Sequence, residues 1–161
     1  MTVPPRPASR VIFVTLLFLL PLLTAIYPLN ESESVDPIVQ NTGARAQVTW
    51  SGTQVLTNTY TVPVSDELVI QACTVVQMDG GVRIVVDGRL TILGTQSCPV
   101  ILEASGLSDH EGIQFNSSSS GRGSLLQNVT IEDSIYGVTI YSSNPVIENL
   151  TVVNPDRVGV D

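Results

Sequence analysis

The sequence contains no lysine, and its basic residues are limited to seven arginines and one histidine. From Asn30 onward, five arginines stand against 15 aspartates and glutamates, so this part of the chain carries a formal charge near −10. Nucleic acid and anionic lipid surfaces are bound through basic patches, which such a composition does not supply. We therefore expect no nucleic-acid partner.

Several sequence signals of enzymes and helical proteins are also missing. No stretch after the N-terminal region keeps an apolar period of 3.6 residues for three turns, which argues against a helical domain. Zinc-ligand spacing, a phosphate-binding loop and a serine-hydrolase elbow are absent as well. The sequence therefore predicts no metal and no cofactor, and catalysis is uncertain and less favoured than binding.

One long apolar run lies at the N-terminus. In residues 11–29, fifteen of nineteen residues are apolar and none is charged, and Arg6 and Arg10 precede them. This pattern is typical of a secretory signal or a membrane anchor. Leu23-Thr24-Ala25 is not a clean cleavage site, which favours an uncleaved anchor over a cleaved signal. We predict a secreted or membrane-anchored protein, with residues 1–29 as targeting segment, 30–47 as polar linker and 48–161 as a β domain outside the cytoplasm.

Residues 48–161 have the pattern of short strands. Val, Ile, Thr and Leu alternate with other residues at 82–86 and 90–92, and Asp87-Gly88 separates these two runs. Short strands at regular spacing indicate an all-β sandwich, barrel or solenoid.

Internal repeats favour the solenoid. Residues 127–131 (QNVTI) match residues 148–152 (ENLTV) after twenty-one positions, and residues 112–115 (GIQF) match residues 137–140 (GVTI) and then Gly159-Val160. A period in the low twenties corresponds to one turn of a β-helix, whose stacked turns bury a continuous apolar column. The side chains expected to point inward are Ile84, Val86, Ile92, Ile101, Ile113, Phe115, Ile131, Val138, Ile140 and Val152.

The β region also contains a series of short motifs: WSG (50–52), LVIQACTVV (68–76), IVVDGRL (84–90), GT (94–95) and PVI (99–101). With these motifs, about residues 49–161 resemble a known family, the right-handed parallel β-helix repeat proteins of the pectate-lyase-like superfamily. The resemblance implies a right-handed parallel β-helix (solenoid), preceded here by the N-terminal hydrophobic helix. The chain departs from the family at Cys73, where glycine is usual. The family includes both polysaccharide-active enzymes and non-enzymatic surface proteins, so fold alone assigns no activity.

A two-sheet sandwich is the competing fold, because Asp87-Gly88 between alternating strands is also a strong hairpin signal. A hairpin would make neighbouring strands antiparallel, whereas the repeat at Asn128 and Asn149 requires parallel stacking.

The candidates for catalysis are few. Glu132 and Asp133 follow one strand, and Asp156 and Arg157 lie about one coil later, so a shared outward patch is geometrically possible. Paired carboxylates can hydrolyse glycosidic bonds, and carboxylates with Ca²⁺ and a basic residue can drive β-elimination in acidic sugars. The favoured interpretation is that these residues form a solvated turn of an acidic protein.

Asp109, His110 and Glu111 form a short polar cluster, whose histidine could bind a metal or act as a base. The favoured interpretation is that His110, the only histidine, is exposed in a loop.

The asparagines and the tryptophan are interpreted as structural. Asn128 and Asn149 are expected to stack as an amide ladder, although both lie in glycosylation sequons. Asn30 and Asn116 are the possible glycosylation sites, and Asn116, in the serine-rich loop 116–123, is expected to be the more accessible acceptor. Trp50 is expected to cover one end of the core rather than to bind sugar.

The two cysteines, Cys73 and Cys98, are twenty-five residues apart, which is the spacing from Gly112 to Gly137. One coil of winding would place them in adjacent layers, within reach of a disulfide. Two buried, reduced thiols are the alternative.

Together these features predict an extracytoplasmic, surface-associated β-helix protein with a binding or structural role. Its expected partners are carbohydrate or another cell-surface protein, and the membrane through residues 11–29. A polysaccharide lyase or glycoside hydrolase acting on acidic glycans is the alternative. Because a new coil begins at Gly159 without a cap, the β domain is also expected to be incomplete at its C-terminus.

Overall fold

The structure is a computed structural model, which describes residues 45–157 and Val160. The predicted targeting segment (1–29) and most of the predicted linker (30–47) lie outside the described residues. Among the residues that are described, no helix has the length and apolar character needed to cross a membrane.

Short strands follow one another in coils of two or three. The first coil contains β1 (Gln47–Trp50), β2 (Thr53–Leu56) and β3 (Tyr60–Val62), and the second contains β4 (Glu67–Gln71), β5 (Val75–Met78) and β6 (Arg83–Val86). The third coil contains β7 (Arg89–Leu93), β8 (Val100–Ala104) and β9 (Gly112–Phe115), followed by a 3₁₀ turn at Ser117–Ser119. The fourth contains β10 (Leu125–Glu132) and β11 (Val138–Ile140), and β12 (Val146–Val153) starts the fifth.

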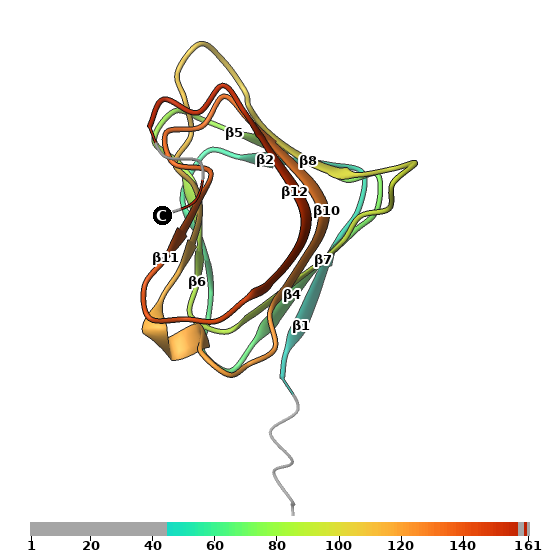
Figure 1. Cartoon of the computed structure of the whole chain (residues 1–161), viewed down its shortest axis with the longest axis vertical. Helices are drawn as coiled ribbons and strands as arrows, with labels where there is room; N and C mark the ends of the chain where they lie inside the picture. Colours follow the sequence, from blue (N-terminus) through green and yellow to red (C-terminus); the bar gives the residue numbers. More distant parts are fainter. Residues whose placement is uncertain (1–44, 158–159, 161) are drawn as a thin grey trace, which may run out of the picture. The chain divides into compact units, whose positions relative to one another are not determined.

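All pairings between these named strands are parallel, so the described region is a parallel β-helix, as predicted. One sheet has the order β1-β4-β7-β10-β8-β5-β2 with β12 added on β10, and the other has the order β11-β9-β6-β3. In Figure 1 the coils lie over one another, with β6 and β11 facing β10 and β12 across the core. The strands on either side of Asp87-Gly88 pair with other coils rather than with each other, so the hairpin of the sandwich alternative is not formed.

The repeats predicted from the sequence coincide with the strand register. Gln127 aligns with Glu148 and Ile131 with Val152, while Ile113 aligns with Val138. Val138 in turn bridges to Val160, so the valine of the third copy is in register with the second. The sequence period is therefore the coil period.

Apolar side chains fill the interior as a single column. Seven of the ten predicted inward residues are fully buried, and Ile140 packs against the column from its edge. Val152, in the last described coil, is only half-buried. The prediction for Ile101 was wrong: Val100 and Leu102 point inward, because β8 pairs with β5 so that Leu102 stacks on buried Val76. Three successive apolar residues hide the period of two that would have shown which of them faces the core.

The corner that leads into β9 and β11, strands of the smaller sheet, depends on glycine. Gly112 and Gly137 both have positive φ, of 79° and 70°, and a Cβ added to Gly112 would overlap the carbonyl group of Gly137. Left-handed backbone is accessible to glycine without steric cost, and the absence of a side chain lets the two coils approach. This close approach explains why Gly-Ile and Gly-Val recur at the same place in the repeat.

Candidate functional site

A hollow lies on the outer face of the sheet formed by β6, β9 and β11. Ile84, Ile113 and Val138 point into the core. Because side chains alternate along a strand, the residues next to them in the sequence face outward. The hollow has a volume of about 230 Å³ and extends over three coils. Its lining consists of Arg83, Glu111, Gln114, Tyr136, Thr139 and Tyr141.

Polar side chains on one side of the hollow hold each other in place. The guanidinium of Arg83 is ion-paired with the carboxylate of Glu111. Its Nη1 also donates to Oε1 of Gln114 at 2.7 Å. Since both Arg83 and Glu111 are partly shielded from water, this pairing fixes the guanidinium more firmly than an exposed ion pair would.

The same network continues away from the hollow through Asn116 to Asp87. Gln114 Nε2 donates to Oδ1 of Asn116 at 2.8 Å, and Asn116 Nδ2 donates to Oδ1 of Asp87 at 2.9 Å. The hydroxyl of Ser118 donates to the same carboxylate oxygen at 2.7 Å. The hydrogen bonds from Asn116 and Ser118 lower the pKa of Asp87, so its carboxylate is charged at neutral pH.

Two tyrosines also line the hollow, one before and one after β11. Tyr141 is 56% exposed, whereas Thr139 between them is only 7% exposed and lies at the floor. Arg157, from the next coil, places its guanidinium carbon 5.6 Å from the centroid of the Tyr136 ring and donates to the phenolic oxygen at 3.0 Å. The hollow thus combines a fixed polar side with an aromatic side.

The patch proposed from the sequence around Glu132, Asp133, Asp156 and Arg157 has a different arrangement. Asp133 is a corner residue with φ 53°, and its Oδ1 accepts from Nδ2 of Asn154 at 3.3 Å, one coil later. Asp156 is exposed and Glu132 is half-buried. Within residues 45–157, the ion pairs are those of Arg83 and Arg89, so Arg157 contacts Tyr136 rather than a carboxylate. Of the four, Arg157 alone adjoins the hollow.

His110 was expected to be exposed, and this expectation was wrong, because the side chain is fully buried. Its Nδ1 accepts from the backbone N–H of Gly112 at 2.9 Å, so Nε2 carries the proton and donates to the carbonyl of Glu132 at 3.0 Å. Burial lowers the pKa of the imidazole, against smaller raising effects of the Glu132 carbonyl and of nearby Asp109 and Asp133. His110 therefore connects two coils as a neutral ring.

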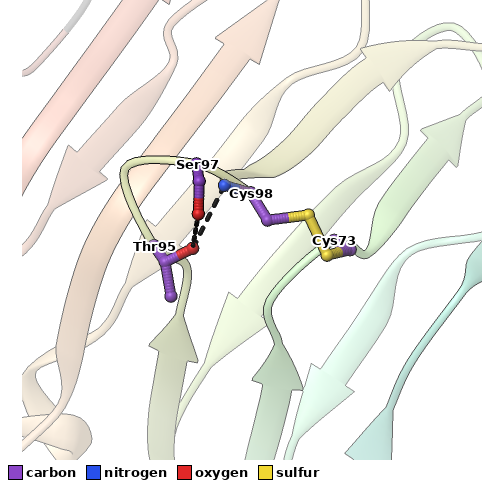
Figure 2. Close-up of a disulfide and its surroundings, with 4 residues drawn as sticks. All are labelled: Cys73, Thr95, Ser97 and Cys98. Atoms are coloured by element: carbon purple, nitrogen blue, oxygen red, sulfur yellow. Dashed lines mark hydrogen bonds between the residues drawn. A yellow bond between two sulfur atoms is a disulfide. The ribbon is translucent and has the colours of Figure 1, made fainter.

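The two cysteines are paired, as predicted. Cys73 and Cys98 are in disulfide linkage with a Cα separation of 4.9 Å, and Figure 2 shows the bond joining the corner after β4 to the turn before β8. That turn is held by the hydroxyl of Thr95, which accepts from the backbone N–H of Cys98 at 3.1 Å. Cys73 has φ 65°, a left-handed conformation that favours the glycine usual at this place in the resembling family.

The predicted asparagine ladder is also present. Asn149 Nδ2 donates to Oδ1 of Asn128 at 3.2 Å, and Asn128 Nδ2 donates to the carbonyl of Gly94 at 2.9 Å. Both asparagines have positive φ, which bends the long strands β10 and β12 around the core. Asn116, a possible glycosylation site, is half-buried with its amide bonded on both sides, and Asn30 lies outside the described residues.

Sequence analysis missed most residues that line the hollow and considered only Glu111, beside His110, as a site residue. Arg157, considered together with Asp156, adjoins the hollow through Tyr136. The available signal was the outward position next to each inward repeat residue: Arg83 precedes Ile84, Gln114 follows Ile113 and Thr139 follows Val138. No group of three or more potential metal-ligating His, Cys, Asp or Glu side chains occurs in the described part of the chain.

The chain was compared with protein families, curated proteins and solved structures. No family model matches it, no curated protein matches it, and no solved structure matches it. The parallel β-helix therefore rests on the structure itself, and the hollow is a candidate site on its geometry.

Proposed function

We propose that the chain is an extracytoplasmic surface protein that binds a polysaccharide in the hollow over β6, β9 and β11. Support comes chiefly from the lining: an exposed aromatic side chain, Tyr141, lines the same hollow as amide and guanidinium groups that the network holds in place. A sugar ring has apolar faces and a rim of hydroxyls, so it suits an aromatic surface beside fixed donors and acceptors. The hollow spans three coils, which suits an extended chain better than a single sugar.

Export supports the same role. The apolar run at 11–29 behind Arg6 and Arg10 is the signal for a secreted or anchored protein, and a cysteine pair at disulfide distance suits an oxidising compartment. Membership of the pectate-lyase-like superfamily and a right-handed winding are part of this proposal, carried by the sequence motifs.

Binding is favoured over cleavage because of how the carboxylates are placed. Glycoside hydrolysis requires a carboxylic acid that keeps its proton near neutral pH, opposite a second carboxylate. Near the hollow, Glu111 is committed to Arg83, and Asp87 has a lowered pKa. In the patch of Asp133 and Asp156, the carboxylate of Asp133 accepts from Asn154 of the next coil. Asp133 and Asp156 therefore do not form a pair of carboxylates directed at a bound chain.

The proposal is tested with the purified full chain on a panel of soluble polysaccharides by affinity gel electrophoresis. We expect retardation in at least one polysaccharide and none for the variant Gln114→Ala combined with Tyr141→Ala. Val55→Ala, which alters an exposed residue on β2 of the other, larger sheet, serves as the matched control. Release of reducing ends or unsaturated products, abolished by Asp133→Ala or Asp156→Ala, would instead establish the lyase or hydrolase alternative.

A further inference from the structure

We infer that the polysaccharide is uncharged, and that one of its sugar rings lies on the phenol of Tyr141. This inference rests on the proposed function and specifies the chemical class of its ligand. Three features carry it: the state of the charges in the hollow, the charge of the surrounding protein and the exposure of the two tyrosines.

The cation inside the hollow is already neutralised. Arg83 is ion-paired with Glu111 and donates to Gln114 as well. A uronate entering the hollow would have to displace Glu111 from the guanidinium and leave that carboxylate, which is largely buried, without its partner. A hydroxyl group makes no such demand, because it can donate to Glu111 or to the oxygen of Thr139 and accept from the remaining N–H groups.

The field around the hollow also opposes a polyanion. The chain has no lysine, and from Asn30 onward acidic residues outnumber arginines by 15 to five. Asp87, charged because of its lowered pKa, is joined to the hollow through Asn116 and Gln114. Repeated uronates along an acidic glycan would meet this negative potential at each sugar.

The aromatic surface is available at one tyrosine. The ring of Tyr136 is covered by the guanidinium of Arg157, whereas Tyr141 is 56% exposed at the other end of β11. A large exposed aromatic side chain costs solvation free energy unless a ligand covers it, and a sugar face would do so without any charge. Arg157 is the cation near the hollow with which an acidic sugar could form an ion pair. Its replacement therefore tests the opposite case, an acidic ligand.

The experiment measures binding of the full chain to immobilised neutral glycans (xylan, mannan and mixed-linkage β-glucan) and acidic glycans (polygalacturonate and alginate), over a series of salt concentrations. We expect binding to a neutral glycan that salt leaves unchanged. Tyr141→Ala should weaken it about tenfold, whereas Tyr141→Phe, Arg157→Gln and the control Val55→Ala should leave it intact. Because Tyr141 is exposed, its replacement should not unfold the protein, and circular dichroism verifies this.

The outcomes are distinguishable. Preferential binding to polygalacturonate or alginate that weakens steeply with salt and is lost in Arg157→Gln would overturn the neutral ligand, while the proposed function would stand. Neutral binding that Tyr141→Ala leaves unchanged would overturn the role of Tyr141. Binding to none of the five glycans would overturn the proposed function and this inference together.

Discussion

His110 donates through Nε2 to the carbonyl oxygen of Glu132 at 3.0 Å, and this bond joins the third coil to the fourth. The other ring nitrogen accepts from the N–H of Gly112, so both nitrogens of a fully buried imidazole are occupied and the ring is neutral. A proton on Nδ1 would face the N–H of Gly112 and break that bond.

The stability of the fold should therefore depend on pH. The pKa of His110 is lowered in the folded state from an ordinary value of 6.5, so the unfolded chain takes up the proton more readily. The contribution of His110 to the free energy of unfolding is complete above about pH 6.5, the ordinary pKa of histidine. It is lost as the pH falls from there through the lower pKa of the folded state. Urea unfolding should show this loss in the wild type and a flatter profile in His110→Leu. Equal slopes for the two proteins would contradict the assignment.

The stacking of Gly112 on Gly137 predicts a contrast between two glycine substitutions. Gly112→Ala should cost more than about 3 kcal/mol, because its Cβ would overlap backbone and its φ is 79°. Gly121→Ala has a similar φ of 70° but open space around it, so it should cost only about 1 kcal/mol. Thermal unfolding measures both. Similar losses would show that the backbone conformation alone matters.

The disulfide should stabilise the second and third coils. Loss of a cross-link closing about 25 residues costs about 3 kcal/mol in the chain-entropy model, so Cys98→Ser should unfold at lower denaturant. The double variant Cys73→Gly with Cys98→Ser should recover about 1 kcal/mol, because glycine accepts the positive φ of Cys73. Mass spectrometry of alkylated, non-reduced protein provides the direct check: free thiols at both positions would refute the bridge.

The asparagine ladder predicts a further contrast. Asn128→Ala should cost about 2–3 kcal/mol, since it removes the bonds to Gly94 and Asn149 and strains a corner with φ 49°. Asn128→Gly should lose about 1 kcal/mol less, because only the hydrogen bonds are removed. Asn149→Ala, at an exposed position, should cost less than Asn128→Ala. Chemical unfolding measures the three losses. If Asn128→Ala proved the least destabilising of the three, the ladder would not be a source of stability.

Membrane attachment through residues 11–29 is tested by fractionation with alkaline carbonate. The full chain should remain with the membranes, and Leu19→Arg should release it or prevent its export, because a charge at the centre of the span costs about 2.5–3.5 kcal/mol. Val55→Ala again serves as control. Full-length wild-type chain found solely in the soluble fraction would contradict an uncleaved anchor.

The repeat motifs made the β-helix predictable from sequence alone, because stacked coils align equivalent residues and the period is visible without coordinates. Gly112, Gly137, Asn128 and Asn149 mark corners whose backbone conformation favours these residue types, and the spacing of Cys73 and Cys98 matches one coil. The excess of acidic residues likewise follows from composition, and export remains a prediction from the apolar run at 11–29.

Tertiary structure decided which side chains of each strand face outward, and which outward side chains of different coils lie next to one another. In Val100-Ile101-Leu102 every residue is apolar, so pairing with β5 chose the inward pair. His110 was expected to be exposed in a loop, whereas the neighbouring coil buries it and supplies the carbonyl of Glu132 as its partner. The hollow brings together side chains from three coils, each unremarkable in its own segment, because a solenoid places residues more than twenty positions apart within one layer spacing.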